Sequence, residues 1–593
     1  MKTVFFICIL LALARKSHQA SFYRTYECVN NLCQRTARPL SFSELGDISS
    51  NNIYTTVAAC RLVCSNTAGL WPLPTGSLET GTNYLGVHPS NFRFDMQDVA
   101  SGARPFVSQS TNIFLDNLRP VCDEDCTMRQ STVMVHVKVN SSNLNLDWDT
   151  NEQYTLNLST KGNNVTVIIV AMTAYGARHG LETLSQLTAP IITPDGGRGL
   201  VILDFAVIKD KPVFPHRGLL IDTARNFLPV TDILRTIDGL ASNKMNVLHW
   251  HATDSQSFPL EIKSVPLMTE FGAYGLDKIY SAEDMAQIVM YGKARGVRVI
   301  LELDSPSHAG AGWEWGESIG YGKLAVCANQ QPWNQFCIQP PCGQLNPVNL
   351  RTYRVLRSIY KDVLEIWGHE SVLHLGGDEV FLPCWNSSVE IISAMQERGM
   401  NRSEEDFLKL WGEFHSTQVQ MLDQERNSNS ISAIVWSSHL TSPDIIENHL
   451  DKKRFVIQTW VERSSPLPRK LLRLGYRLIV STKDAWYLDH GFWGTTTYHT
   501  WRDVYNNRLS RQEGVLGGET CMWGEYVSPG SLDARIWPRT AAVAERLWSD
   551  PQRISTADAE PRLEGQRKRL KYLGISSDAL APEWCAQHPR QCM

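Results

Sequence analysis

The amino-acid sequence predicts an α/β fold class, a (β/α)8 TIM barrel preceded by a smaller α+β domain. Eight short apolar segments recur after residue 216, and each ends in polar or aromatic residues. Amphipathic helical patterns lie between several of these segments. Eight strand-then-helix units over roughly 330 residues are typical of a closed barrel.

Length and composition bound the domain organisation. The chain has 593 residues, more than one average domain, with 43% hydrophobic and 20% charged residues. We therefore divide it into a signal peptide (1–20), a cysteine-rich N-terminal segment (21–76), an α+β domain (77–212) and a barrel with a C-terminal extension (213–593). The net charge of −4 shows no basic excess of the kind that binds nucleic acid, so we expect no nucleic-acid partner.

The first twenty residues resemble a secretory signal. Lys2 precedes the apolar run Val4–Ala14, which is too short to span a bilayer, and Ala20 offers a small residue for cleavage. An uncleaved anchor is the alternative. We expect the secretory pathway, a secreted or lysosomal product and no stable membrane insertion. Five glycosylation sequons agree with this route: Asn140, Asn157, Asn164, Asn386 and Asn401.

Fourteen cysteines also suit an oxidising compartment. We expect local pairs, and one pair that ties two loops: Cys122 with Cys126, Cys337 with Cys342, Cys585 with Cys592, and Cys327 with Cys384. Cys28, Cys33, Cys60 and Cys64 predict a small stapled knot whose connectivity the sequence leaves open. Cys521 is left over from these predicted pairs. It lies in an apolar strand, and we expect a buried, unreactive thiol. The cysteine and histidine spacing indicates no metal site, and we expect no cofactor.

Residues 77–212 alternate in the manner of strands, for instance at Val133–Val139 and Val165–Val170, with a helix predicted over Ala174–Leu187. In this region we find no acid/base residues with a spacing that suggests a catalytic site. Asp210–Pro215 is the predicted linker to the barrel.

The barrel pattern can then be followed segment by segment. The predicted strands are Gly218–Asp222, Asn246–His251, Val297–Leu303, Val372–Leu375, Ala433–Trp436, Phe455–Trp460, Arg477–Val480 and Val515–Gly518. The predicted helices are Thr231–Ser242, Ser281–Arg295, Leu350–Trp367, Ser403–Gln424 and Ser531–Trp548. In a barrel of this kind the active site lies at the C-terminal ends of the strands.

The strand Val372–Leu375 is followed by two glycines and two adjacent carboxylates, Asp378 and Glu379. Neighbouring residues on an extended backbone point in opposite directions, so the two carboxylates can take different roles. Paired carboxylates with different roles suit the cleavage of glycosidic bonds. A solvated turn after the strand is the alternative interpretation.

Other strand endings would bring further polar and aromatic groups to the same mouth. They are Asp222, Arg225, His249, His251, Asp254, Asp304, His308, Trp436, Trp460, Asp484, Tyr487, Asp489, Trp523 and Glu525. Alone, Arg225 could be a structural ion pair, and Trp436 and Trp460 could be core. We place His249 and His251 on opposite faces of their strand, so that at most one faces the mouth. Fifteen of the 18 tryptophans lie between Trp250 and Trp548, which suits stacking on sugar faces.

Five of these segments resemble the family 20 glycoside hydrolases, the β-N-acetylhexosaminidases. The segments are Arg217–Arg225, His249–Asp254, Asp304–His308, His374–Glu379 and Trp523–Glu525, in the order typical of the family. The resemblance covers roughly residues 75 to 590. The N-terminal cysteines resemble those of arthropod members, and Ser481–Gly494 is most similar to the fused-lobes type, which trims N-glycans.

The resemblance implies a mechanism in which the 2-acetamido oxygen of the substrate attacks the anomeric carbon. Glu379 would be the general acid and then the base, with a pKa raised by enclosure, and Asp378 would hold the acetamido N–H. The other implied roles are a hydrogen bond to the acetamido oxygen from Tyr487, pocket walls from Trp436, Trp460 and Trp523, hydroxyl binding by Arg225, Asp489 and Glu525, and support of the acid by Asp254 and His308.

We therefore expect an exo-acting β-N-acetylhexosaminidase that releases terminal GlcNAc, with GalNAc tolerance left open, from a glycan partner. The neutral Gln339, beside a Trp333 that would stack on the leaving sugar, and the short segment after Tyr487 favour N-glycans. The alternatives are a chitooligosaccharide-degrading enzyme and an inactive glycan-binding protein. A homodimer is left open.

Overall fold

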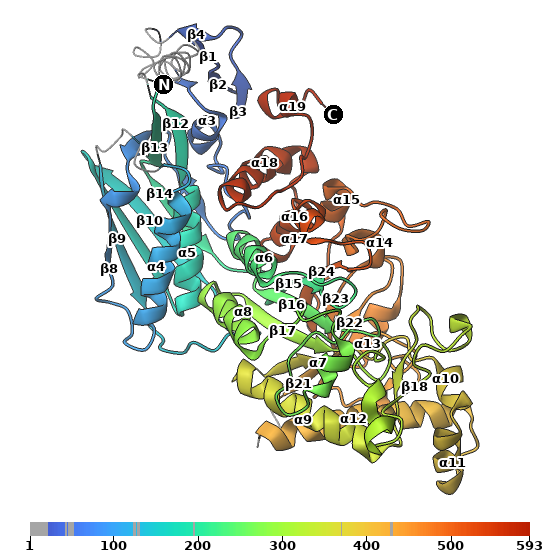
Figure 1. The fold of residues 1–593 in the computed structure, drawn as a ribbon. Helices are drawn as coiled ribbons and strands as arrows, with labels where there is room; N and C mark the ends of the chain where they lie inside the picture. The colour runs from blue at the N-terminus through green and yellow to red at the C-terminus, as the bar shows by residue number, and fades with distance from the viewer. Residues whose placement is uncertain are drawn as a thin grey trace, which may run out of the picture.

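The computed structural model describes residues 22–41, 44, 52–122, 126, 131–193, 196–368, 371–426 and 431–592. The predicted signal peptide lies outside these residues. Figure 1 shows three parts: a small N-terminal module, a sheet-and-helix domain and a barrel whose C-terminal segment returns to the N-terminal module. Within the described residues, helices long and apolar enough to cross a membrane are absent.

The N-terminal module is a small disulfide-stapled unit. Its elements are β1 (Phe22–Tyr23), β2 (Tyr26–Val29), β3 (Leu32–Arg35), β4 (Leu40–Ser41), β5 (Ile53–Tyr54) and α3 (Val57–Cys64). The bonds Cys28–Cys64 and Cys33–Cys60 join α3 to the hairpin of β2 and β3, which resolves the connectivity that the sequence left open.

The α+β domain is built on a six-stranded sheet. Its strands, in spatial order, are β6 (Leu78–Thr80), β14 (Ala206–Asp210), β10 (Tyr154–Lys161), β11 (Asn164–Ala171), β9 (Thr132–Val139) and β8 (Phe92–Asp95). Alternate residues of β9 are buried, as the sequence pattern predicts. Helix α5 (Ala174–Gln186) packs on β10 and β11, and α4 (Arg104–Leu118) packs on α5. A second sheet joins β12 (Thr188–Ile192), β13 (Arg198–Leu203) and β7 (Tyr84–Val87).

The sequons Asn140, Asn157 and Asn164 are exposed in this domain. Asn401 is exposed on the barrel, whereas Asn386 is half-buried and its side-chain oxygen accepts hydrogen bonds from Arg402. All but Asn386 are thus freely accessible to a glycan, and their glycosylation remains a prediction.

Eight parallel strands close a barrel in chain order. They are β15 (His216–Asp222), β16 (Val247–Thr253), β17 (Arg298–Leu303), β20 (Val372–His374), β21 (Ser432–Trp436), β22 (Phe455–Thr459), β23 (Arg477–Val480) and β24 (Val515–Met522). Every predicted strand is present, and the α/β fold class is confirmed.

Helices surround the barrel, except that the last of them packs on β3 of the N-terminal module (Figure 1). They are α6 (Val230–Ser242), α7 (Leu267–Gly272), α8 (Ala282–Ala294), α9 (Leu350–Trp367), α10 (Leu382–Ser387), α11 (Val389–Glu397), α12 (Glu404–Arg426), α13 (Leu467–Arg473), α14 (Lys483–Trp486), α15 (Trp501–Asn506), α16 (Pro529–Ile536), α17 (Arg539–Trp548), α18 (Thr556–Tyr572) and α19 (Glu583–Gln587). The single helix predicted over Ser531–Trp548 is wrong, because Pro538 has no backbone N–H and separates α16 from α17.

The α+β domain docks against the end of the barrel opposite the strand C-termini. Arg217 at the start of β15 pairs with Glu152 at 2.6 Å, and Lys244 pairs with Asp210 at 2.9 Å. Trp148 donates a hydrogen bond from Nε1 to Nδ1 of His216 at 3.0 Å. Its ring packs against the apolar layer that fills this end of the barrel. The opposite end is therefore the one left open for a site.

Candidate active site

The turn after β20 directs the two adjacent carboxylates into the mouth. Gly376 has φ +65°, and a Cβ there would lie 1.8 Å from Oδ1 of Asp304, so only glycine fits. The N–H of Gly377 donates to the same oxygen at 3.0 Å. Glu379 itself has φ +48°, an unfavourable region for a side-chain-bearing residue that is often held at functional sites.

His308 links Glu379 to a second carboxylate. Its Nε2 lies 3.4 Å from Oε2 of Glu379, and its Nδ1 lies 3.3 Å from Asp254. Asp254 also pairs with Arg225 at 2.7 Å. The side chain of Glu379 is 27% exposed, whereas that of Asp254 is fully buried. Glu379 thus faces the open mouth, with His308 and Asp254 behind it.

The environments of the two neighbouring carboxyl groups drive their pKa values apart. Burial, opposed by the charge of His308 and reinforced by that of Glu379, raises the pKa of Asp378 to about 7. Burial would also raise the pKa of Glu379, but its hydrogen bond to His308 and the imidazolium charge outweigh burial and lower it. The expectation of a raised pKa at Glu379 is therefore wrong for the substrate-free site, because His308 stabilises the carboxylate.

A chain of alternating histidines and carboxylates lies beneath the site. Nε2 of His251 is 3.2 Å from Asp254 and its Nδ1 is 2.6 Å from Glu302. His249 contacts Glu302 and Glu519, each at 2.9 Å. The placement of His249 and His251 on opposite faces is thus wrong, because residues two apart on a strand share a face.

Some of these side chains are close enough together to be considered as a metal site, for example those of His249, Glu302 and His374. However, both ring nitrogens of His249 face carboxylates: its Nδ1 hydrogen-bonds to Glu519, and its Nε2 lies 2.9 Å from Glu302 without an aligned hydrogen bond. Attraction from the two carboxylates overcomes burial and raises the pKa of His249 to about 9. The cluster fits an ion-pair network better than a metal site.

Aromatic rings form one wall of the mouth. Trp436, Tyr487, Cys521 and Leu220 are buried together, with Trp460 and Trp523 packed against them. The indole N–H of Trp436 donates to Glu302 at 2.7 Å, and that of Trp460 donates to the carbonyl of Ser437 at 2.6 Å. Both rings are therefore fixed in orientation, and Cys521 is a buried free thiol.

Several buried polar atoms at this mouth lack a hydrogen-bond partner among the described residues. They are Nε of Arg225, Oδ1 of Asp378, Oδ1 of Asp489 and Oε2 of Glu525. Buried polar atoms are almost always paired in folded proteins, so unpaired atoms clustered in a cleft indicate a polar ligand. The resemblance assigns Arg225, Asp489 and Glu525 to sugar hydroxyls and Asp378 to the acetamido N–H.

The loop before α9 closes one side of this cluster. Gln339 donates to Oε1 of Glu525 at 3.0 Å and accepts from Arg225 at 3.3 Å. The sequence placed Gln339 only at the entrance and missed these contacts. Trp333, on the 3-10 turn Trp333–Gln335, is 38% exposed. Trp493, 40% exposed, donates to Oδ2 of Asp489 at 2.9 Å and adds a second ring at the rim.

Disulfides hold the loops that carry these groups. Cys327–Cys384 joins the loop after β17 to helix α10 after β20, and Cys337–Cys342 closes the loop of Gln339. Cys122–Cys126 and Cys585–Cys592 lie elsewhere. Each of these four bonds is one that the sequence predicts.

Asp484 accepts a hydrogen bond from the N–H of Arg463 and takes no part in the cluster described above.

Comparisons with known proteins agree with this geometry. Residues 214–551 match the glycosyl hydrolase family 20 catalytic domain, and residues 70–187 match a domain described as beta-acetyl hexosaminidase like. The chain is 37% identical to a chitooligosaccharidolytic beta-N-acetylglucosaminidase of Bombyx mori, covering 99% of this chain and 98% of that protein. It is 35% identical to a probable beta-hexosaminidase of Drosophila melanogaster, covering 96% and 91%.

A solved structure shares the fold. The exo beta-N-acetylglucosaminidase of Vibrio harveyi, in complex with N-acetylglucosamine, aligns with a TM-score of 0.68 at 21% identity, covering 86% of this chain and 78% of that one.

Proposed function

Since the chain belongs to glycosyl hydrolase family 20 and is an exo-acting β-N-acetylhexosaminidase, we propose that Asp378 and Glu379 carry out substrate-assisted cleavage of terminal β-linked GlcNAc on N-glycans. One observation carries the residue assignment. Glu379 faces the mouth with His308 behind it, while the neighbouring Asp378 presents a buried oxygen without a protein partner.

The proposed first step is attack by the acetamido oxygen of the substrate on its own anomeric carbon. The bond to the leaving sugar breaks, and the leaving oxygen takes a proton from Glu379. The N–H of the acetamido group donates to Oδ1 of Asp378, whose charge offsets the positive charge of the oxazolinium-like intermediate. Tyr487 would donate to the acetamido oxygen. Because the reacting groups belong to one molecule, orientation reduces the barrier.

In the second step Glu379 takes a proton from water, which attacks the anomeric carbon and opens the intermediate with retention. His308 and Glu379 can share the proton that this cycle needs, because they lie 3.4 Å apart. A bound sugar would exclude water from the exposed part of Glu379. Loss of that water disfavours the carboxylate and moves the proton toward the acid.

Exo action follows from the shape proposed for the pocket. Arg225 and Glu525 would bind hydroxyls of the terminal sugar, and Gln339 bridges these two residues. We propose that this bridge closes the site beyond the terminal sugar and so limits cleavage to the chain end. The enclosing rings of Trp436, Trp460 and Trp523 would hold the acetamido methyl group.

Two observations support N-glycans as the substrate class. Gln339 supplies an uncharged side chain where the loop meets the site, and the segment after Tyr487 is short. The second candidate is a chitooligosaccharide. It is favoured by the exposed rings of Trp333 and Trp493 and by the name of the Bombyx mori relative.

The compartment and the assembly are also proposals. Six disulfides and the hexosaminidase relatives support a secreted or lysosomal location. A homodimer remains a prediction that light scattering of the purified protein would test.

A thiazoline analogue of GlcNAc tests the mechanism directly. It mimics the cyclised intermediate and should inhibit far more tightly than GlcNAc, because enzymes bind such intermediates better than products. Asp378→Asn should weaken this inhibition much more than it weakens binding of GlcNAc. Isolation of a covalent glycosyl–carboxylate adduct by mass spectrometry would contradict the proposal.

A further inference from the structure

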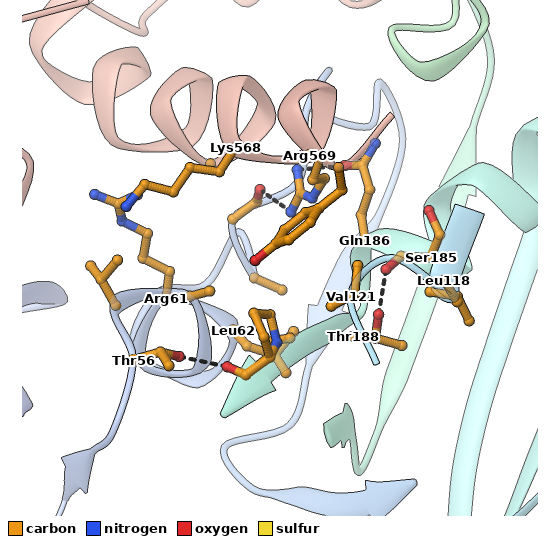
Figure 2. A pocket seen from close by; sticks show the side chains of 18 of the residues that line it. Thr56, Arg61, Leu62, Leu118, Val121, Ser185, Gln186, Thr188, Lys568 and Arg569 are labelled. Atoms are coloured by element: carbon orange, nitrogen blue, oxygen red, sulfur yellow. Dashed lines mark hydrogen bonds between the residues drawn. The ribbon is translucent and has the colours of Figure 1, made fainter. Parts of the chain in front are cut away.

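A cavity of about 470 Å³ lies where the three parts of the molecule meet. Helix α3 of the N-terminal module, helix α5 and strand β12 of the α+β domain, and helix α18 of the C-terminal segment line it (Figure 2). Ser242, at the end of α6, places the cavity toward the end of the barrel opposite the active site. Its volume lies within the range of small-molecule sites, roughly 300–1,000 Å³.

Besides Arg24, three cationic side chains line this cavity, and one of them, Arg61, repels the other two. Arg61 comes from α3, and Lys568 and Arg569 come from α18. Figure 2 shows Lys568 extending from its helix toward Arg61. Burial lowers the pKa of Lys568, and burial lowers the pKa of Arg569 to about 10; repulsion from Arg61 adds to both shifts. The positive charges are thus close enough to destabilise one another.

Neutral groups are the hydrogen-bond partners that the structure gives these cations. Arg61 donates to the carbonyl of Ala586 at 3.2 Å, and Arg569 donates to the carbonyl of Gly69 at 3.2 Å and to the amide oxygen of Gln566 at 3.2 Å. Within the described chain, none of the three cations forms an ion pair at 4.0 Å or less, and Lys568 has no recorded hydrogen bond.

The nearby carboxylates are already paired. Glu182, which lines the cavity, contacts Arg178 at 3.3 Å, and Glu564 contacts Arg567 at 2.8 Å. More distant attractions act without a direct contact, from Glu564 on Arg61 and Lys568 and from Glu182 on Arg569. Positive charge in the cavity therefore exceeds negative charge.

The remaining wall is largely apolar. Leu62, Leu118, Val121, Ala189, Ile192 and Leu573 line it. A bare inorganic ion would leave this surface uncovered. The wall instead fits an organic ligand with a hydrocarbon body, whose burial is favourable in proportion to its apolar area.

We propose that this cavity is a second ligand site, which binds an amphipathic anion: a carboxylate placed against Arg61, Lys568 and Arg569, with a hydrocarbon body along the apolar wall. Such a ligand would neutralise the cation cluster and connect α3, α5 and α18. It would stabilise the junction of the three parts without contacting the active site.

Decanoate is the probe, and decanol and sodium sulfate are the two comparison compounds. Each is titrated separately into the full-length mature protein. Isothermal titration calorimetry should show saturable binding of decanoate at one site, and the melting temperature should rise with decanoate concentration. Decanol and sulfate should each bind at least tenfold more weakly. Equal binding of decanol would overturn the role of the cations, and equal binding of sulfate would overturn the role of the apolar wall.

Lys568→Gln is the test variant, because Lys568 is half-buried and its loss breaks no recorded hydrogen bond. Loss of one charged contact should weaken decanoate binding by about tenfold or more. Lys571→Gln, an exposed position on the same helix, is the matched control and should bind as the wild type does. Hydrolysis of a nitrophenyl GlcNAc glycoside should be unchanged in both. Absence of saturable decanoate binding, or equal affinities of the two variants, would overturn the site.

Discussion

Nε2 of His308 lies 3.4 Å from Oε2 of Glu379, so the proposed acid and its neighbouring imidazole form one proton-sharing unit. Both residues have positive φ, His308 at +54° and Glu379 at +48°, so the backbone of each is held in an unusual conformation. Strain at two facing residues is consistent with a site built for function at some cost in stability.

Glu379→Gln should retain the shape of this pair but remove the proton donor. General acid catalysis typically contributes about 10²–10⁴-fold, so kcat on a GlcNAc-terminated glycan should fall by this amount. The loss should be smaller on a nitrophenyl glycoside, whose leaving group needs little protonation. Steady-state kinetics on both substrates measures the difference. Equal losses would count against Glu379 as the acid.

Asp489→Asn should stabilise the protein at high pH. Burial, opposed by the hydrogen bond from Trp493, raises the pKa of Asp489 to about 7, above its ordinary 3.8. The folded state therefore holds this proton between about pH 4 and 7 while the unfolded state has lost it, so wild-type stability declines across that window.

The asparagine keeps an acceptor for Trp493 and carries no titrating charge. The stability gain over wild type should be absent below about pH 4, grow up to about pH 7 and then level off at a few kcal/mol or less. Urea unfolding at several pH values measures it. Asp444→Asn, at an exposed position, is the control and should follow the wild-type curve. A gain independent of pH would show that the charge is not the cause.

The Cys327–Cys384 bond should contribute to both stability and catalysis. Cys384 lies in α10, which begins three residues after Glu379, and both cysteines are buried. Replacing both cysteines by alanine should cost about 2–5 kcal/mol and lower kcat/KM several-fold by loosening the catalytic turn. The control is the paired substitution of Cys585 and Cys592, which should spare kcat/KM. Peptide mapping that finds Cys327 bonded elsewhere would refute the premise.

Much of the barrel can be predicted from the sequence because its strands are short, apolar and followed by polar residues. The motif around Asp378 and Glu379 was recognisable from its two glycines, and the structure explains them by the close approach of Asp304. Most side chains at the strand ends could be assigned to the mouth from topology alone, although Asp484 and His249 lie outside the cluster there. The Gln339 contacts could not, since they depend on how a long disulfide-bonded loop folds back.

The buried ion-pair network was missed for a different reason. Glu302 and Glu519 each lie within a largely apolar strand, and a glutamate in such a strand is the signal the sequence offers. Their partners come from other strands, so the pairing depends on barrel register. The register also explains why residue 218 is a glycine. A Cβ on Gly218 would lie 2.4 Å from Cγ of Glu519 on the neighbouring strand.

Glu519→Gln should therefore be strongly destabilising. It removes a charge that faces His249 at 2.9 Å and His216 at 2.6 Å, and leaves a buried imidazolium partly uncompensated. Breaking one partner of a buried pair commonly costs about 3–5 kcal/mol. Glu513→Gln, at an exposed position, should cost little. A urea midpoint for the Glu519 variant equal to wild type would mean that the network carries no net charge interaction.

Substrate choice should depend on the rings at the rim. Trp333 is 38% exposed, and we propose that its ring stacks on the leaving sugar. Trp333→Ala should therefore raise KM for chitotriose and for a biantennary GlcNAc-terminated glycan. It should leave hydrolysis of GlcNAc fluoride unchanged, because fluoride is too small to reach the ring. Trp493→Ala, at the other rim position, separates the contributions of the two rings.

In the wild type, kcat/KM should favour the biantennary glycan over chitotriose, because the short segment after Tyr487 gives a linear chain little surface beyond the first leaving sugar. A clear preference for chitotriose would replace the N-glycan proposal with the chitooligosaccharide one and leave the assignment of Asp378 and Glu379 intact.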